Sequence, residues 1–183
     1  MAARSLQVFT TEELTTLLGL DPKKDKRRVI KFAESREYGI VPSIKLASGS
    51  GSRRLYDLEN VCEFALALHL LRTGLRSQLI GQAIRDLRKK EKLSAKLELV
   101  GARLQKLKLL IARESEPGRL PNKIRDRLIS FQEGGDDLSE IIASTFCNSI
   151  GGPDLILIPI GQTFSDLKDQ LYRLRSEWAM ENL

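Results

Sequence analysis

Two helix-breaking residues near the N-terminus, Gly19 and Pro22, most constrain the fold of this chain. Before Gly19 the sequence FTTEELTTLLG offers Thr10 or Thr11 as an N-cap, followed by glutamates and leucines at helical spacing. After it, Pro22 suits the first turn of a second helix, for which Gly39 is the expected terminator. Two helices joined by a short turn that contains glycine predict a helix-turn-helix.

The second predicted helix is rich in cations, namely Lys23, Lys24, Lys26, Arg27, Arg28, Lys31 and Arg36. Residues 1–92 hold 18 Lys and Arg against 11 Asp and Glu, whereas residues 93–183 hold 12 against 13. A concentrated positive surface attracts polyanions, although a solvated helix face, a membrane surface or an acidic partner also fits the charge alone. The position in a helix-turn-helix favours DNA, because this motif lays its second helix in the major groove.

A β-hairpin and two further helices are expected to complete the same domain. The extended runs PSIKLA and SRRLY flank a Ser/Gly segment, the pattern of two strands with a small flexible tip. Asp57 is the expected N-cap of a mostly apolar helix that ends at Gly74, and an amphipathic helix follows it. We therefore expect residues 1–92 to fold as one DNA-binding domain.

Apolar residues then recur at alternating steps of four and three. They are Leu93, Leu97, Val100, Leu104, Leu107 and Ile111. This a/d rhythm is typical of a coiled coil, so residues 93–115 are predicted to form a long dimerisation helix. Packing of the same apolar face within one chain is the alternative.

The segment SEPGRLPN contains residues that interrupt a helix, and the pattern changes beyond it. Residues 122–183 contain the β-rich runs RLISFQEGGDD and DLILIPIGQTF, a short helical pattern between them, and a final amphipathic helix. They predict a small α+β C-terminal domain with an antiparallel strand pair. The expected fold class of the whole chain is mainly α with small β.

The sequence offers little support for catalysis or metal binding. Cys62 and Cys147 are not part of a CxxC pair, and His69 lacks metal-ligand spacing to either. Cys62 lies in an apolar helical run and is expected to be a small buried residue. We expect no enzyme activity, no cofactor and no metal. With neither a membrane-span pattern nor a secretory signal, the expected location is the cytoplasm.

The order of these elements and several short sequence segments resemble those of the MerR family of bacterial transcription regulators. The matching pieces are FTTEELTTLLGL, IKFAES with YGIVP, SRRLYDLENV and LHLLRTGLRSQLIGQAI. The resemblance implies that Arg54 and Tyr56, in the wing, contact the DNA backbone. The chain departs from the family where KFAE, reached after the extra basic stretch KKDKR, replaces Arg-Tyr-Tyr-Glu. This departure favours the lysines and arginines of the second helix as DNA contacts.

The leading hypothesis is a homodimeric, sequence-specific transcription regulator that binds double-stranded DNA at a pseudo-palindromic site. The alternative is a DNA-architectural or excisionase-like adaptor whose C-terminal domain recruits another protein. In either case that domain is a candidate to contact RNA polymerase or another protein. The candidate DNA-binding residues are Thr11, Lys24, Arg27, Arg28, Lys31, Arg53, Arg54 and Tyr56.

Overall fold

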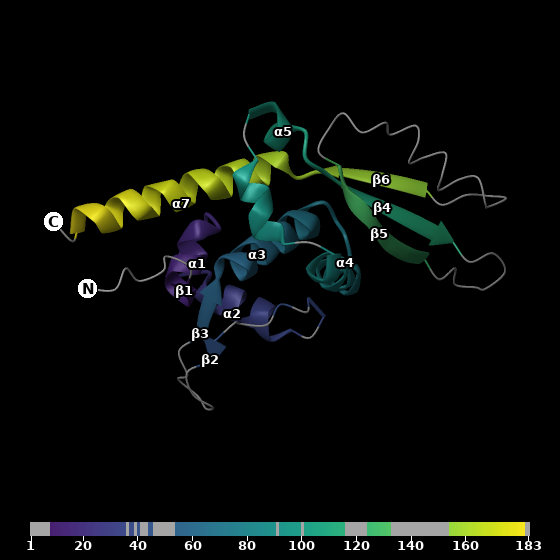
Figure 1. The fold of residues 1–183 in the computed structure, drawn as a ribbon. Helices are drawn as coiled ribbons and strands as arrows, with labels where there is room; N and C mark the ends of the chain where they lie inside the picture. Colours follow the sequence, from purple (N-terminus) through teal and green to yellow (C-terminus); the bar gives the residue numbers. More distant parts are fainter. Residues whose placement is uncertain are drawn as a thin grey trace. The chain divides into compact units, whose positions relative to one another are not determined.

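The computed structural model forms two compact units (Figure 1). Unit 1 comprises residues 1–98 and 163–183, and unit 2 comprises residues 99–162. The structure describes residues 8–35, 37–38, 40, 44–45, 54–90, 92–99, 101–115, 124–132 and 154–181. These residues are mainly helical with two small sheets, so the predicted fold class, mainly α with small β, is confirmed.

Unit 1 begins with strand β1 (Val8–Thr10) and helix α1 (Thr11–Leu17). Thr10, one of the two predicted N-caps, forms a capping box with Glu13: the Glu13 amide donates to Thr10 Oγ1 at 3.3 Å, and the Thr10 amide donates to Glu13 Oε2 at 2.6 Å. Gly19 ends the helix with φ of 65°, and its amide donates to the Thr16 carbonyl at 2.9 Å. A positive φ suits glycine, so its predicted role as terminator is confirmed.

Replacing the capping residue is expected to weaken unit 1. Thr10→Ala removes the side-chain acceptor for the Glu13 amide and should lower the free energy of unfolding by about 1 kcal/mol. Denaturant unfolding would measure the change. Thr16→Ala is the control, because Thr16 Oγ1 only donates back to the Glu12 carbonyl within the helix, an interaction that adds little stability. Equal losses in the two variants would contradict a capping role.

Helix α2 (Lys26–Glu34) begins and ends inside the predicted range of 22–39. It begins late because the Asp21 carboxylate accepts hydrogen bonds from the amides of Lys23 and Lys24, at 2.8 and 3.3 Å, and holds these residues in a turn. It ends early because Ser35 takes an extended conformation, with ψ of 118°. The prediction of a second helix is therefore confirmed, but the observed helix is shorter than predicted at both ends.

A three-stranded antiparallel sheet accompanies these helices, in the order β1-β3-β2. Strand β2 (Ile44–Lys45) pairs with β3 (Arg54–Asp57), as the predicted hairpin requires, and β3 also pairs with β1. The Ser/Gly tip of the hairpin lies outside the described residues. Asp57 then caps the next helix by accepting from the Asn60 amide at 2.8 Å, as predicted.

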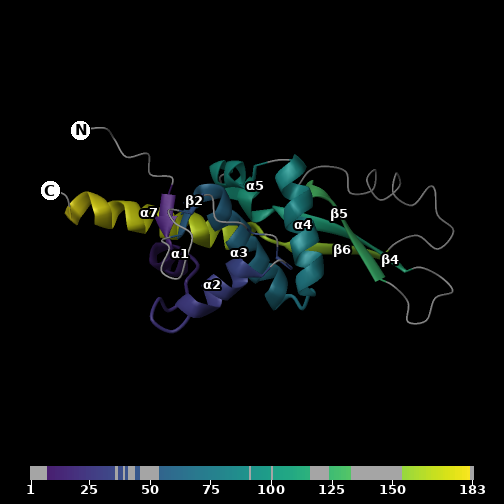
Figure 2. The same cartoon turned by 90° about the horizontal axis from the view of Figure 1, so that it is seen from below.

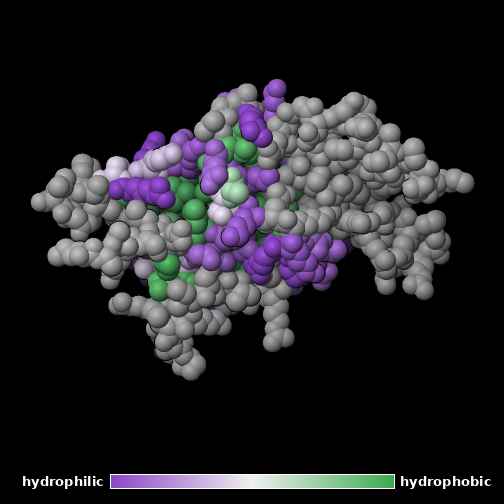
Figure 3. Space-filling view, in the orientation of Figure 1, coloured by the Kyte–Doolittle hydropathy of each residue, from purple (hydrophilic) through white to green (hydrophobic). Residues whose placement is uncertain are grey.

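Helix α3 (Leu58–Arg72) runs through the core of unit 1, and most of its residues are buried. Helix α4 (Ser77–Lys90) packs against it with an apolar face, while its outward face is hydrophilic (Figure 3). A 3-10 helix, η1 (Leu93–Glu98), follows and also packs on α3. The Glu59 carboxylate fixes its start, accepting from the amides of Leu93 and Ser94 at 2.5 and 2.9 Å.

The predicted coiled-coil helix over residues 93–115 is wrong. This range forms η1, then the short helix α5 (Gly101–Gln105), then strand β4 (Lys108–Ser115). The seam leucines at 93, 97, 104 and 107 are all buried within the chain, whereas the side chains at 100 and 111 lie outside the described part. The described leucines therefore pack within one chain, which was the alternative to a coiled coil.

Unit 2 contains α5 and an antiparallel sheet in the order β5-β4-β6. Strands β5 (Ile124–Gln132) and β6 (Asp154–Pro159) overlap the two predicted β-rich runs. They do not pair with each other as predicted, because β4, which lies in the range of the predicted coiled coil, lies between them. The short helix predicted between the runs falls on residues that are not described.

The last helix, α7 (Gly161–Glu181), confirms the predicted C-terminal helix, but from Thr163 onward it belongs to unit 1. Its residues Phe164, Leu167 and Leu171 are buried, whereas Tyr172 is exposed. Figures 1 and 2 both show its C-terminal half extending beyond α1 and β1. The domain boundaries predicted at 92 and 122 thus differ from the observed division, in which unit 2 interrupts unit 1.

Candidate nucleic-acid interface

Helix α2 separates an apolar face from a basic one. Val29 and Phe32 are buried, with 2% and 7% of their surface exposed, and they attach the helix to unit 1. Arg27 and Lys31 are exposed, and their spacing of four residues places them on one face. The side chain of Arg28 lies outside the described part of the structure. The structure therefore brings two of the predicted DNA-binding cations together.

The turn before α2 adds further positive charge. The Lys24 side chain is 84% exposed, and its Nζ lies 3.8 Å from an oxygen of Asp21. Lys26 Nζ lies 3.9 Å from a carboxylate oxygen of Glu12 on α1. Exposed ion pairs of this length contribute little to stability, so these lysines could exchange their carboxylate partners for phosphates.

Tyr56 is not available to DNA, and its predicted role as a backbone contact is wrong for this structure. The residue is fully buried on β3, and its ring meets that of Phe64 edge to face, with centroids 5.6 Å apart. A strand alternates its side chains between two faces, and the inward position at 56 makes this tyrosine part of the core. Arg54, two residues earlier, is half-buried on the same strand.

The remaining predicted DNA-binding residues differ in how exposed they are. Thr11 is the first residue of α1 and is half-buried. Arg53 lies outside the described residues, directly before β3. Of the eight predicted DNA-binding residues, the side chains of Lys24, Arg27 and Lys31 are exposed in the structure, and those of Thr11 and Arg54 are partly exposed.

Four aromatic rings connect the basic helix to the sheet. Tyr38, after α2, stacks on Phe32 with centroids 3.7 Å apart, and Phe32 lies 5.8 Å from Phe64 on α3. Phe64 in turn contacts Tyr56 on β3. Such contacts between rings add stability beyond the burial of their area. The series fixes α2 relative to α3 and β3, a role that the sequence pattern did not predict for Phe32 or Tyr38.

A buried carboxylate, that of Glu63, lies on α3. Glu63 is 1% exposed and accepts from Arg88 Nε and Nη2, both at 2.7 Å, and from Asn60 Nδ2 at 3.1 Å. Burial raises the pKa of Glu63, and the ion pair with Arg88 counteracts the rise. Cys62, as expected, is buried, and burial together with neighbouring carboxylates raises its pKa. The raised pKa disfavours the thiolate, which is the reactive form of cysteine.

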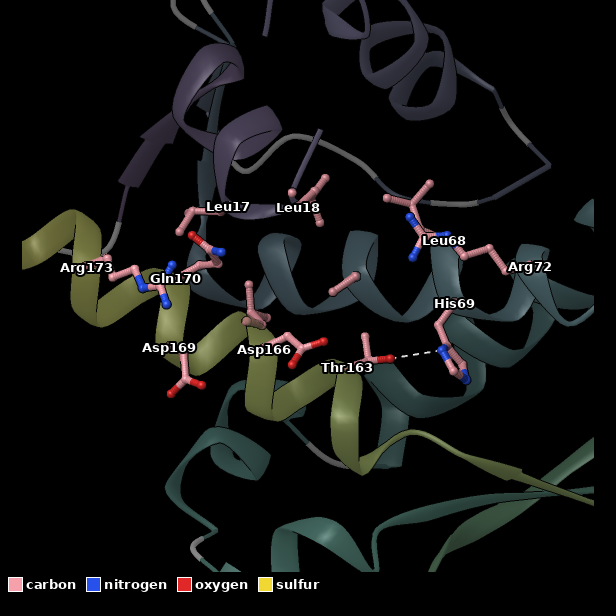
Figure 4. Close-up of a pocket in the computed structure, with 13 residues that line it drawn as sticks. Leu17, Leu18, Leu68, His69, Arg72, Thr163, Asp166, Asp169, Gln170 and Arg173 are labelled. Atoms are coloured by element: carbon pink, nitrogen blue, oxygen red, sulfur yellow. Dashed lines mark hydrogen bonds between the residues drawn. The ribbon is translucent and has the colours of Figure 1, made fainter. Parts of the chain in front are cut away.

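A pocket of about 360 Å³ opens in unit 1 between the end of α1, α3 and the first half of α7 (Figure 4). Its apolar lining includes Leu17 and Leu68, and Arg72 and Asp166 are among its charged residues. Thr163 Oγ1 lies 2.9 Å from His69 Nδ1 and links α7 to α3. This hydrogen bond gives His69 a structural role.

Two other features are absent from the described residues. They contain no group of three or more His, Cys, Asp and Glu residues that could share a metal ion. None of their helices combines the length and apolar character needed to cross a membrane. No protein-family model matches this chain, and no curated protein matches it.

Proposed function

We propose that this protein is a sequence-specific DNA-binding transcription regulator in which unit 1 acts as a winged helix-turn-helix. In this proposal α1 and α2 form the helix-turn-helix, and the β2–β3 hairpin is the wing. The single observation that carries it is the division of α2: Val29 and Phe32 are buried, while Arg27 and Lys31 face solvent. A recognition helix needs this division, because it must be held by the domain and still enter a groove.

The charge distribution supports DNA as the ligand. Lys24, Lys26, Arg27 and Lys31 lie on α2 and the turn before it. The ion pairs of Lys24 with Asp21 and of Lys26 with Glu12 are exposed and long. Arginine and lysine can donate to phosphates and to the O6 and N7 atoms of guanine. The half-buried Arg54, which begins β3 opposite the end of β2, would hold a backbone phosphate beside the groove.

Two parts of the proposal concern partners. The protein binds as a homodimer to a pseudo-palindromic site, through an interface other than the rejected helix over 93–115. Unit 2 recruits another protein, with RNA polymerase as the first candidate for a regulator that acts at promoters. These parts are independent of the contact between α2 and the groove.

Selection of duplexes from a random pool, followed by affinity measurements at several salt concentrations, tests the proposal. We expect one enriched motif with two-fold symmetry, and an affinity that falls steeply with salt because bound phosphates release counterions. A pool without enrichment, or an affinity independent of salt, would overturn DNA recognition. An enriched single half-site would overturn only the dimer. Genome-wide occupancy outside promoters would favour an architectural or adaptor protein over a regulator.

A further inference from the structure

The chain that follows α2 lies directly against the backbone of α4. A Cβ atom added at Gly81 would collide with the Glu37 carbonyl oxygen and would lie 2.7 Å from the Glu37 carbonyl carbon. It would also lie 3.2 Å from the carbonyl carbon of Tyr38. Only glycine, which has no Cβ atom, leaves room at position 81 for the backbone of Glu37 to lie this close to α4.

A side-chain hydrogen bond lies one helical turn away on α4. Ser77 Oγ donates to Glu37 Oε2 at 2.5 Å, and Ser77 and Gly81 are four residues apart, on one face of the helix. The two contacts are independent, because one involves the backbone of Glu37 and the other its carboxylate. Together they fix Glu37 on α4.

The fixed segment is connected to the buried side of α2. Tyr38 follows Glu37, and its ring stacks on Phe32 with an interplanar angle of 20°. Phe32 is on the buried face of α2, whose exposed cations at 27 and 31 lie on another face. A shift of Glu37 would therefore move Tyr38 and, through Phe32, change the angle at which α2 presents its cations.

We propose that Ser77, Gly81 and Glu37 form a seat on α4 that positions α2 for sequence-specific DNA binding. The inference rests on the proposed function. The three are positioning residues: the Glu37 carboxylate is bound to Ser77 and, being negative, would be repelled by a phosphate. The seat acts on specificity because base contacts need a defined helix angle, whereas phosphate attraction tolerates more variation.

Ser77→Ala tests the seat without changing charge. We expect the affinity for the enriched duplex to fall roughly three- to tenfold, which corresponds to the free energy that one hydrogen bond contributes. Affinity for random duplex and the salt dependence should stay unchanged, because no phosphate contact is lost. Ser77→Thr, which keeps the hydroxyl, should restore the affinity. Gln78→Ala, at an exposed neighbouring position on α4, is the matched control and should bind as the wild type.

Glu37→Ala separates positioning from electrostatics by the sign of its effect. If Glu37 only repelled DNA, removing its charge would strengthen binding; loss of the seat should instead weaken specific binding by roughly three- to tenfold. Glu37→Gln keeps an acceptor oxygen for Ser77 and should bind the enriched duplex more tightly than Glu37→Ala. Thermal unfolding of each variant verifies that the protein is folded at the temperature of the binding assay.

Three outcomes would overturn the seat. They are wild-type affinity in folded Ser77→Ala, equal loss on specific and random duplex, and tighter binding by Glu37→Ala. A wild-type protein without sequence preference would overturn the proposed function and the seat with it. A wild type that selects a motif, together with an unaffected Ser77→Ala, would overturn the seat alone.

Discussion

Arg88→Met is expected to lower the free energy of unfolding by about 3 kcal/mol at neutral pH, the largest single-residue effect on stability that we predict. Arg88 supplies two charged donors to Glu63, which is buried on α3 and otherwise receives a hydrogen bond from Asn60. Methionine keeps most of the side-chain length but leaves the carboxylate buried without its cation. Denaturant unfolding at pH 7 would measure the loss.

The same variant should regain stability in acid. Burial raises the pKa of Glu63 above its usual value of 4.5, and Arg88 is the main factor that lowers it, so its removal should raise this pKa further. The folded state then binds the proton more tightly than the unfolded state. The stability linked to this proton is fully present below about pH 4.5 and is lost as pH rises through the folded-state pKa. The deficit of Arg88→Met relative to wild type should therefore shrink between pH 7 and pH 4.5.

A double variant is the control for this interpretation. Adding Glu63→Gln to Arg88→Met replaces the buried charge with a neutral amide, so the double variant should be more stable at pH 7 than Arg88→Met. Its stability should also lack the extra gain in acid. A pH-independent deficit in Arg88→Met, or a double variant that is less stable still, would contradict a buried charge as the cause.

Arg27→Ala combined with Lys31→Ala is expected to produce the largest loss of DNA affinity. Both side chains are exposed on the same face of α2, and each charged contact contributes about 1 to 3 kcal/mol, so the pair should weaken binding roughly 100-fold. If both cations contact phosphates, the slope of log affinity against log salt should fall by about 1.8. Titration of the enriched duplex at several salt concentrations would measure both quantities.

A matched pair of cations on another helix controls for net charge. Arg173 and Arg175 are exposed on α7, and replacing both by alanine changes the charge of the protein by the same amount. This control should change affinity much less than the α2 variant. Equal losses in the two double variants would show that net charge, and not the face of α2, determines binding.

The elements of unit 1 could be predicted where local chemistry defines them. The capping residues Thr10 and Asp57 and the terminator Gly19 have the predicted roles, because each acts on neighbouring amides or on its own backbone angles. The cations Arg27 and Lys31 on the second helix were also predicted from the sequence, whereas the buried face formed by Val29 and Phe32 is a finding of the structure. Such features depend on a few adjacent residues.

The errors arose where distant contacts decide the structure. The 93–115 range has a heptad rhythm, yet Glu59 fixes η1 on α3, and β5 and β6 pair with β4 on either side. Leu107 and Leu109 are buried on either side of the half-buried Lys108, which fits the period of a strand. Tyr56 is a core residue because its strand also pairs with β1, far away in the sequence, and because its ring packs on Phe64. Glu59 likewise lies 34 residues from Leu93, so neither contact has a local signal.

The return of α7 to unit 1 determines how the chain would respond to a break. Residues 99–162 leave unit 1 and lead back to it, and the Thr163–His69 hydrogen bond and the buried Phe164, Leu167 and Leu171 lie in the returning segment. Proteolytic cleavage within unit 2 would therefore leave two fragments joined by non-covalent packing. A chain that stopped at residue 98 would instead lack α7 and expose the leucines that line the pocket beside it. The basic helix and most of the last helix are thus parts of one compact unit, although residues 35–160 separate them in the sequence.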